Sequence, residues 1–295
     1  MPEIAITLIG NGLDNSAENR AAQLVKETGV DNLKIDQLHS GYAVDILVKA
    51  DSPALVPLLQ QKFSTLNGFD VFVQANDSFR KKKLFVADMD ATMVKQETLD
   101  ELAAHLNLKD KISQITEKAM RGEIDFQGAL RLRVGMLKGL PLSAIFETLA
   151  KVEYSQGAAT LIKTMRRHGT VCVLVSGGFD LFTVPVAETL GFNKNYGNRL
   201  EIVEGKLTGE VIPPIIDKDA KERIVVDMAR AGGCDMKQVA TIGDGANDVP
   251  MLKKAGTGIG YFGKPAVIAA TPHQIRYTDL TSVLYMQGYR KAEFA

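Results

Sequence analysis

The sequence predicts an α/β protein in which a doubly wound, Rossmann-like parallel sheet carries an inserted helical bundle and follows a smaller ferredoxin-like α+β unit. Three observations support this prediction. From residue 84 onward, short apolar runs typical of buried strands alternate with helical patterns. Residues 97–152 contain four helical patterns and no strand pattern. Residues 1–78 read in the order βαββαβ, which is the ferredoxin-like arrangement.

The first unit, residues 1–78, contains no acid pair, glycine loop or histidine cluster, so we expect it to bind a ligand or to dimerise rather than to catalyse. Its second helix is predicted to begin at Ser52-Pro53, a cap followed by a proline in the first turn, and Pro57 could kink it. The other predicted elements are strands at 4–8, 30–38, 44–48 and 69–74 and a helix at 17–28.

A basic linker, residues 79–83, is predicted to join the first unit to the rest of the chain. Its lysines, Lys81, Lys82 and Lys83, could attract anions. A solvated tether that protects the following apolar strand from aggregation explains them better.

The third unit, residues 84–295, is predicted to hold the large sheet, with the helical bundle at about 96–153 inserted as a cap over the strand ends. A hairpin is expected from 200–203 to 207–211. The predicted cap helices are 97–106, 109–120, 125–137 and 142–152, with Gly122 in one of the joins. The other predicted strands are 84–87, 171–175, 239–242, 258–262 and 274–277, and the other predicted helices are 156–167, 217–230 and 281–286.

The composition excludes several classes of protein. Lysine plus arginine and aspartate plus glutamate both number 35 in the 295 residues, so nothing suggests nucleic acid as a partner. Two distant cysteines, Cys172 and Cys234, are expected to be reduced thiols. The four histidines have no ligand spacing, which disfavours a zinc site or a Ser-His-Asp triad. With no basic leader and no membrane-length apolar run, we expect a soluble cytoplasmic protein.

Polar residues that suit phosphate chemistry follow three of the predicted strands. Asp88 and Asp90 end the apolar run at 84–87, Ser176-Gly177-Gly178 follows the run at 171–175, and Gly243-Asp244-Gly245-Ala246-Asn247-Asp248 follows the run at 239–242. Carboxyl ends of parallel strands meet at one edge of a sheet, where ligands bind. Taken singly, each motif is more simply a turn or a helix cap. Taken together, the three favour a catalytic site.

Each of these residue types has a role in a phosphate site. Mg²⁺ prefers oxygen ligands, which the carboxylates of Asp88 and Asp244 and the backbone carbonyl of Asp90 would supply. Ser176, the Gly177 N–H and Lys221 would donate to the phosphoryl oxygens. Asp88 would attack phosphorus, and Asp90 would protonate the leaving oxygen and then deprotonate water. A lone lysine such as Lys221 is otherwise a solvated side chain.

These motifs resemble those of the haloacid dehalogenase superfamily of aspartate-nucleophile phosphatases, and most closely its phosphoserine phosphatase family. The family signature extends from Asp88 to Glu97 and includes a helix, Phe126–Leu137, in which Arg133 matches the family's arginine. The first unit is similar to the ACT-like domain of longer bacterial members. The resemblance implies a Mg²⁺-dependent hydrolysis of phosphoserine, the last step of serine synthesis, and a protein that could form a homodimer.

The resemblance also implies a set of site residues. Asp88 would be the nucleophile and Asp90 the acid/base, with Asp88, Asp90 and Asp244 holding magnesium and Asp248 supporting them. The implied substrate-binding residues are Glu97, Arg133, Ser176, Gly177, Lys221 and Asn247. Arginine can grip a carboxylate and Glu97 can pair with an ammonium, which suits a zwitterionic substrate. From the residues alone, Glu97 and Arg133 read equally well as a helix-start acid and a surface cation, and Asp100 or Glu101 would serve as well as Glu97.

One position departs from the family pattern. Ala91 stands where phosphoserine phosphatases usually have serine. Two alternatives stay open at this point: a phosphatase or phosphotransferase for another small phosphorylated metabolite, and a non-catalytic amino-acid sensor with a degenerate phosphatase body. The non-catalytic sensor is disfavoured because the chain keeps the acid pair, Lys221 and Asp244.

Overall fold

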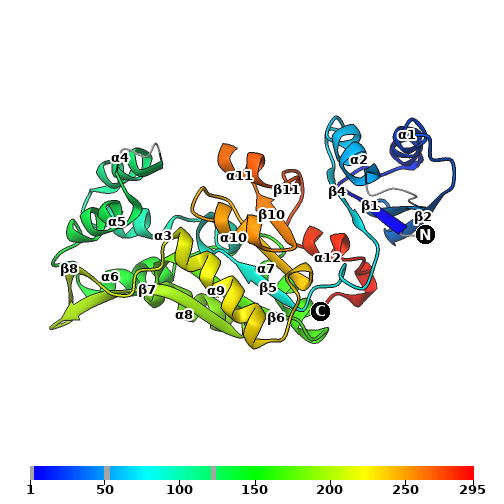
Figure 1. Ribbon diagram of the computed structural model, residues 1–295. Coiled ribbons are helices and arrows are strands. Elements are labelled where there is room, and N and C mark those ends of the chain that lie inside the picture. Colours follow the sequence, from blue (N-terminus) through cyan, green and yellow to red (C-terminus); the bar gives the residue numbers. More distant parts are fainter. Residues whose placement is uncertain (1–2, 50–53, 121–123) are drawn as a thin grey trace.

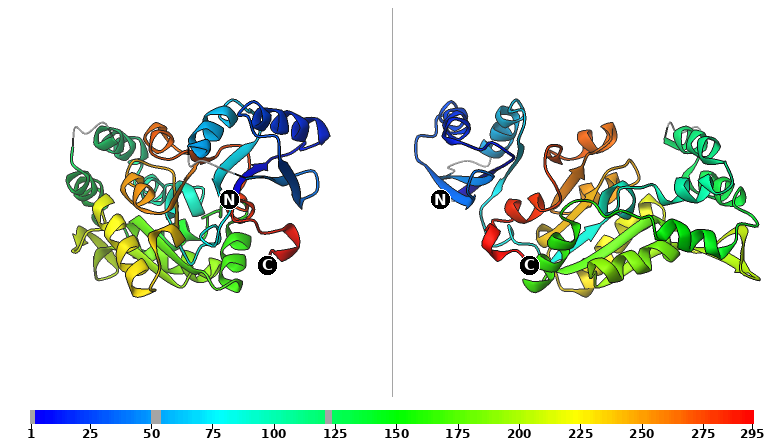
Figure 2. Two further views of the ribbon diagram at one scale, coloured as in Figure 1. Left: turned by 45° about the vertical axis from the view of Figure 1, so that its right-hand side comes forward. Right: turned by 180° about the vertical axis from the view of Figure 1, so that it is seen from behind.

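The computed structural model describes residues 3–49, 54–120 and 124–295 and contains two separate sheets. Figure 1 shows an elongated molecule in which the four-stranded sheet lies at one end and the cap helices lie at the other. The seven-stranded sheet occupies the middle, and the view from behind in Figure 2 shows the same order. In the part of the chain that the structure describes, no helix is long and apolar enough to cross a membrane.

The four-stranded sheet has the order β2-β3-β1-β4, and its pairs are all antiparallel. This confirms the predicted βαββαβ order. The predicted helix start at Ser52-Pro53 lies outside the described residues, and Pro57 lies in the first turn of α2. The elements are β1 (Glu3–Ile9), α1 (Asn15–Lys26), β2 (Leu33–His39), β3 (Ala43–Lys49), α2 (Leu55–Phe63) and β4 (Asp70–Ala75).

The seven-stranded sheet has the order β11-β10-β9-β5-β6-β7-β8, and all its pairs are parallel except β7 with β8. That antiparallel pair is the predicted hairpin, although β7 begins earlier than expected. The strands are β5 (Leu84–Ala87), β6 (Val171–Phe179), β7 (Lys194–Val203), β8 (Lys206–Ile212), β9 (Val239–Gly243), β10 (Thr257–Tyr261) and β11 (His273–Ile275).

The central strand β5 is buried on both faces, which explains its continuous apolar run. Leu84 and Val86 pack in the same cluster as Val225 of α9 (Lys218–Ala231), whereas Phe85 and Ala87 belong to the larger core on the other face. Helices therefore cover both faces of the sheet, as in a doubly wound fold. The remaining body helices are α7 (Ala158–Arg167), α8 (Asp180–Leu190), α10 (Val249–Lys254), α11 (Pro265–Ala270) and α12 (Ser282–Met286), with 3-10 turns at Met236–Gln238 and Lys291–Glu293.

Three helices of the body, α8, α10 and α11, were not predicted. The pattern of α8 was obscured because Pro185 lies inside it and its apolar residues are not confined to one side. The other two have only six residues each, too few to show a helical period. The strand β6 also continues to Phe179, where a turn was expected from Ser176.

Four helices form the cap between β5 and β6, as predicted. The join at Gly122 lies outside the described residues. The hairpin of β7 and β8 extends beneath these helices, and β8 packs against α5 (Figures 1 and 2). The cap helices are α3 (Thr98–Ala104), α4 (Lys109–Met120), α5 (Phe126–Gly135) and α6 (Leu142–Leu149).

The basic segment that joins the two sheets is not the solvated tether that was predicted. Lys81 and Lys83 are exposed, but Lys82 is buried and its ammonium donates to the Lys237 carbonyl at 2.9 Å. The preceding Arg80 is buried too. The expectation failed because the partners of these side chains lie far away in the sequence.

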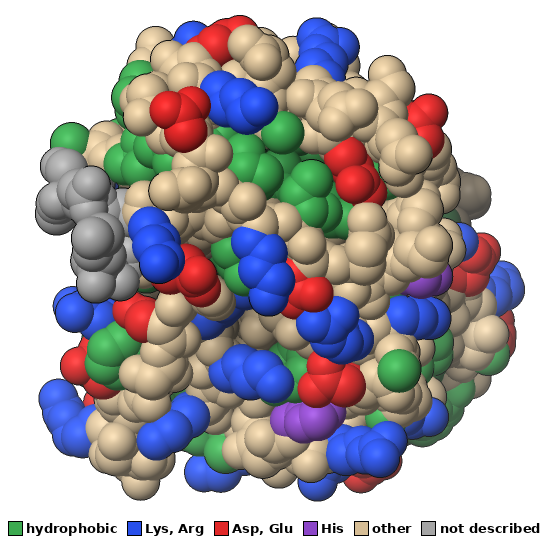
Figure 3. Space-filling model, turned by 90° about the vertical axis from the view of Figure 1, so that its right-hand side faces the viewer, with side chains coloured by type: hydrophobic (Ala, Val, Ile, Leu, Met, Phe, Trp, Pro, Cys, Tyr) green, Lys and Arg blue, Asp and Glu red, His purple; other side chains and the backbone are tan. Residues whose placement is uncertain are grey.

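Arg80 fastens the first unit to the body. Its guanidinium donates to the Asp45 carboxylate at 2.8 Å, to the Thr7 hydroxyl at 3.1 Å and to the Met286 carbonyl at 3.0 Å. Asp70 accepts hydrogen bonds from the backbone N–H groups of residues 276–278. Seen from this end of the molecule, acidic and basic side chains occur next to one another over the surface (Figure 3).

Candidate active site

The carboxyl ends of three neighbouring strands, β9, β5 and β6, open into one cavity of about 710 Å³ beneath the cap. The predicted site residues therefore come together. Eight of them line the cavity: Asp88, Asp90, Glu97, Arg133, Ser176, Gly177, Asp244 and Asn247. The other two, Lys221 and Asp248, are buried and contact Asp88 and the loop after β9.

The backbone after β5 turns back sharply, so that both of its acids face the cavity. The Asp88 N–H donates to the Ile242 carbonyl of β9 at 3.0 Å, which extends the sheet by one residue. Ala91 then adopts a φ of 50° and a ψ of 11°, in the left-handed region that non-glycine residues rarely enter. Its N–H donates to the Gln96 carbonyl at 3.2 Å, which holds the turn.

Lys221 lies behind Asp88 and is only 1% exposed. Its ammonium donates to Asp88 Oδ1 at 2.6 Å and to Asp248 Oδ1 at 2.7 Å. Burial alone would lower the pKa of Lys221, but the charges of Asp248 and Asp88 more than offset it and raise the pKa. Helix α9 places Lys221 in its first turn because the Asp217 side chain caps that helix by accepting the Ala220 N–H at 2.9 Å.

Three carboxylates around this lysine could hold a metal ion. Oxygen atoms of Asp88, Asp244 and Asp248 lie within 4.8 Å of one another. Burial, and then the charge of Asp248, raises the pKa of Asp88 well above its ordinary value, although Lys221 opposes the shift. Two lysines, Lys221 and the partly exposed Lys264 beside Asp244, do not balance the three acids, and a divalent cation with oxygen ligands fits the cluster. The group includes Asp248, which was expected to support the metal site, whereas Asp90 was expected to contribute its backbone carbonyl and is not one of these carboxylates.

Asp248 also holds the loop that carries Asp244. Its second oxygen accepts the backbone N–H groups of Asp244 at 3.2 Å and Gly245 at 3.1 Å. Gly243 leaves the room for this contact, because a Cβ there would lie 2.5 Å from the Asp248 carboxylate. Gly243 of this motif therefore allows close packing around one buried acid.

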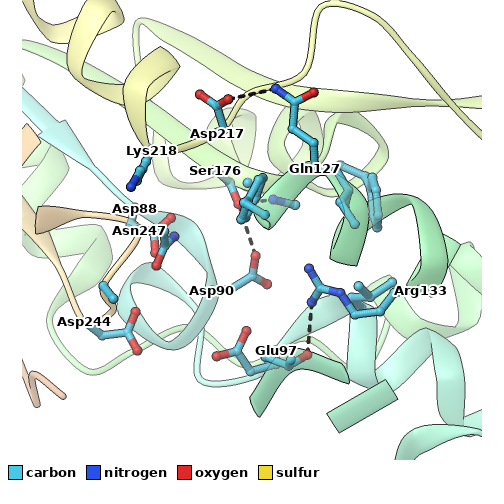
Figure 4. Close-up of a pocket in the computed structure, with 18 of the residues that line it drawn as sticks. Asp88, Asp90, Glu97, Gln127, Arg133, Ser176, Asp217, Lys218, Asp244 and Asn247 are labelled. Atoms are coloured by element: carbon cyan, nitrogen blue, oxygen red, sulfur yellow. Dashed lines mark hydrogen bonds between the residues drawn. The ribbon is translucent and has the colours of Figure 1, made fainter. Parts of the chain in front are cut away.

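The Asp90 carboxylate points away from the three-acid cluster. It accepts the Thr98 N–H at 2.9 Å and the Ser176 hydroxyl at 3.1 Å, as Figure 4 shows for Ser176. Burial raises the pKa of Asp90, against these hydrogen bonds, so the acid keeps its proton closer to neutral pH. The Ser176 hydroxyl also accepts the Gly178 N–H at 2.8 Å, so in this arrangement its proton is directed at Asp90.

Two residues of opposite charge face the cavity from the cap side. Glu97 precedes α3, and although its side chain is 52% exposed, partial burial and then the charge of Asp90 raise its pKa to about 7. Arg133 of α5 donates to the Thr116 hydroxyl at 3.1 Å and to the Ala129 carbonyl at 3.2 Å. Figure 4 shows Asp90 and Glu97 between Asp244 on one side and Arg133 on the other.

Two further residues of the site were not predicted. The ammonium of Lys264 lies 3.0 Å from Asp244 and 3.5 Å from Glu97. Gly263-Lys264-Pro265 follows β10, a neighbour of β9, so extending the strand-end argument to β10 would have found it. Asn198 is fully buried, donates to the Gly177 carbonyl at 2.8 Å and accepts the Ile216 N–H at 2.7 Å. No sequence signal distinguishes Asn198.

Known proteins share both the sequence and the fold. The family model of haloacid dehalogenase-like hydrolases matches residues 85–253. A phosphoserine phosphatase of Streptomyces coelicolor is 36% identical over 292 residues, which are 98% of this chain and 71% of that protein. A phosphoserine phosphatase of Saccharomyces cerevisiae is 31% identical over 305 residues, covering 99% of this chain and 98% of its own length.

One solved structure bears directly on the cavity. It is described as a phospho-aspartyl intermediate analogue of phosphoserine phosphatase and is 36% identical to this chain with a TM-score of 0.66. The match covers 70% of this chain and 98% of that one, so the remaining part of this chain has no counterpart in that structure.

Proposed function

This chain belongs to the haloacid dehalogenase-like hydrolases, and we propose that it hydrolyses O-phosphoserine to serine and phosphate through a phosphorylated Asp88. One observation carries the proposal. The buried Asp88 carboxylate lies 2.6 Å from the Lys221 ammonium and shares its cavity with Asp90, Glu97 and Arg133. The relatives named as phosphoserine phosphatases support the substrate.

In the first step, an oxygen of Asp88 forms a bond to phosphorus while the bond between phosphorus and the serine oxygen breaks. Lys221 orients this carboxylate through Oδ1 and leaves the other oxygen free for attack. Asp90 gives its proton to the departing serine oxygen, a role that suits an acid whose pKa burial has raised.

In the second step, water attacks the phosphorus atom and the bond to Asp88 breaks, which releases phosphate. Asp90 is now ionised and takes the proton of that water, so the acid returns to its starting state. During the first step, in which the phosphoryl group is transferred to Asp88, the cap excludes bulk water from the cavity. Ser176, the Gly177 N–H, Lys221 and Asn247 bind the phosphoryl oxygens.

The cation in this proposal is Mg²⁺. Asp88 and Asp244 would hold it with the backbone carbonyl of Asp90, and Asp248 would support the site through the N–H groups of Asp244 and Gly245. A bound Mg²⁺ supplies positive charge that keeps Asp88 ionised and polarises the phosphoryl group. The buried excess of acid in the cluster is the feature that supports this role.

The rest of the substrate is recognised from the cap side. Glu97 pairs with the ammonium group, and Arg133 binds the carboxylate. A substrate that lacks either group would leave one of these partly buried charges without a partner, which disfavours sugar phosphates.

The chain divides, in this proposal, into an ACT-like unit at 1–78, a linker at 79–83 and a phosphatase unit at 84–295 with its cap at about 96–153. A solved phosphoserine phosphatase that matches 70% of this chain supports an independent phosphatase unit. The first unit binds a small ligand or a second copy of the chain. The enzyme acts on a small molecule in the cytoplasm.

The substrate assignment can be tested with phosphoserine and O-phosphoethanolamine, which lacks the carboxylate. Arg133→Ala should lower kcat/KM for phosphoserine by about 10²-fold, the loss of a charge-assisted contact, and barely change that for phosphoethanolamine. Arg131→Ala, at an exposed position of the same helix, is the matched control. A preference for sugar phosphates that survives Arg133→Ala would refute the assignment.

A further inference from the structure

Lys264 connects two carboxylates that belong to different parts of the site. Its ammonium lies 3.0 Å from Asp244 Oδ2, in the loop after β9, and 3.5 Å from Glu97 Oε1, at the entrance to the cap. The backbone N–H of Lys264 donates to the Asp244 carbonyl at 2.9 Å, so the root of the side chain is fixed against that loop.

The two cavity lysines differ in their freedom to move. Lys221 is enclosed and holds two carboxylates at hydrogen-bond distance, whereas the side chain of Lys264 is 40% exposed. Its contact with Glu97 is long. A lysine ammonium on a flexible four-carbon stem can leave such a position for water at small cost.

The charges around the cavity show what Lys264 replaces. Eight carboxylates line the cavity or lie directly behind it, and only four cationic side chains, those of Lys218, Lys221, Lys264 and Arg133, lie among them. Under the proposed function, Asp244 receives a divalent cation and Glu97 receives an ammonium group. Lys264 contacts these two acids, so its ammonium lies next to the carboxylates that, by that proposal, bind the metal ion and the substrate ammonium.

We propose that Lys264 is a positioning residue that contacts the carboxylates that bind the two cationic ligands, the metal ion and the substrate ammonium, and yields to these ligands when they bind. Its ammonium keeps Asp244 and Glu97 facing each other across the cavity mouth, and it withdraws toward solvent when Mg²⁺ reaches Asp244 and the substrate ammonium reaches Glu97. This inference rests on the proposed function, since it assumes what those two carboxylates bind.

This role of Lys264 predicts the direction in which the metal Kd changes when the lysine charge is removed. An ammonium that must leave Asp244 competes with the metal, so its removal should tighten metal binding. For a half-exposed charge in contact with a ligand, the expected change in Kd is about fivefold, and it should shrink at high salt. A lysine that merely supported the loop would have the opposite effect, because its loss would loosen Asp244.

The experiment is a titration of the full-length protein with Mn²⁺, followed by the electron paramagnetic resonance signal of free Mn²⁺. Lys264→Met keeps an unbranched side chain of nearly the same length and removes its charge, and we expect it to bind Mn²⁺ about fivefold more tightly than the wild type. Lys253→Met removes one charge from an exposed position of α10 and should leave Kd within about twofold. Lys264→Arg should restore the wild-type value.

An unchanged or weaker Kd in Lys264→Met would overturn the inference, and Lys264→Gln gives the same test if the methionine variant does not fold. Two other results would contradict the proposed function itself and not only the role of Lys264. If the wild type bound no Mn²⁺, or if Asp244→Asn bound it as well as the wild type, then the acid cluster would not be a metal site.

Discussion

Two buried charge clusters, one in the cavity and one at the junction of the two sheets, use the same kinds of side chain in opposite ways. In the cavity, Lys221 is shared by Asp88 and Asp248, and Asp244 lies beside them. At the junction, Arg80 meets one acid, Asp45, and its remaining donors reach a hydroxyl, an amide oxygen and a backbone carbonyl.

The difference shows that an unbalanced charge, rather than burial itself, distinguishes a site for ligands from a structural contact. The junction is balanced, because Arg80 faces one carboxylate and each of its three guanidinium nitrogens donates a hydrogen bond, so it needs nothing from solution. The cavity has more acid than Lys221 and Lys264 together neutralise, a cost that a bound cation relieves. The two clusters should therefore respond oppositely to removal of one carboxylate.

The largest effect is expected for Asp88→Asn. Loss of the attacking oxygen should lower kcat by about 10⁴-fold or more, because the amide is a poor nucleophile. The free energy of unfolding should not fall, since one of the excess acids is gone and Lys221 keeps Asp248. Phosphate release and urea unfolding measure the two quantities. Retained turnover would remove Asp88 as the nucleophile.

The converse is expected at the junction. Asp45→Asn leaves Arg80 buried without its counter-charge, so the free energy of unfolding should fall by about 3–5 kcal/mol while kcat of the folded enzyme is unchanged. Arg290→Met breaks the more exposed pair with Asp36 and should cost about 1 kcal/mol or less. Equal losses for the two variants would mean that the buried pair has no special weight.

Addition of Mg²⁺ should stabilise the protein through the cavity cluster and not through the junction cluster. Mg²⁺ at about one hundred times its Kd should stabilise the folded protein by about 2.7 kcal/mol. The same increment should appear in Asp45→Asn, whose defect is elsewhere, and should be much smaller in Asp244→Asn. Thermal unfolding with and without Mg²⁺ measures it, and chelation with EDTA should stop phosphate release. An increment that survives in Asp244→Asn would place the cation elsewhere.

The smallest effect concerns Glu97. Its raised pKa of about 7 means that it loses its proton, and gains the charge that binds an ammonium, as the pH rises through neutrality. The kcat/KM for phosphoserine should therefore rise several-fold between about pH 6 and 8. Glu97→Gln should lack this rise. The substrate phosphate titrates near pH 6 in both enzymes, so the difference isolates Glu97. Glu147→Gln, exposed on α6, is the control.

Much of the cavity could be predicted because its information is local in the sequence. Each of the three strands is a short apolar run, and the polar residue types that follow it are typical of phosphate sites. The parallel sheet then places the carboxyl ends of these strands at one edge, so no contact between distant residues has to be predicted. For the same reason the βαββαβ unit and the four cap helices were correct.

Lys264 was missed because the strand-end argument was not extended to β10, but the other missed residues depend on partners far away in the chain. Arg80 lies 206 residues from the carbonyl that it contacts. Nothing near Asn198 indicates that it joins the end of β6 to the segment before α9. Such contacts are set by how the elements pack, and a linear pattern of residues does not contain that information.

The central claim is that phosphate passes through a covalent bond to Asp88, and trapping that bond tests it most directly. The wild-type protein is quenched during turnover of phosphoserine and reduced with borohydride, which converts an acyl phosphate to an alcohol, and its peptides are analysed by mass spectrometry. We predict homoserine at position 88, and none there when phosphoserine is omitted. Homoserine at another aspartate, or at no position under conditions of full turnover, would contradict the account.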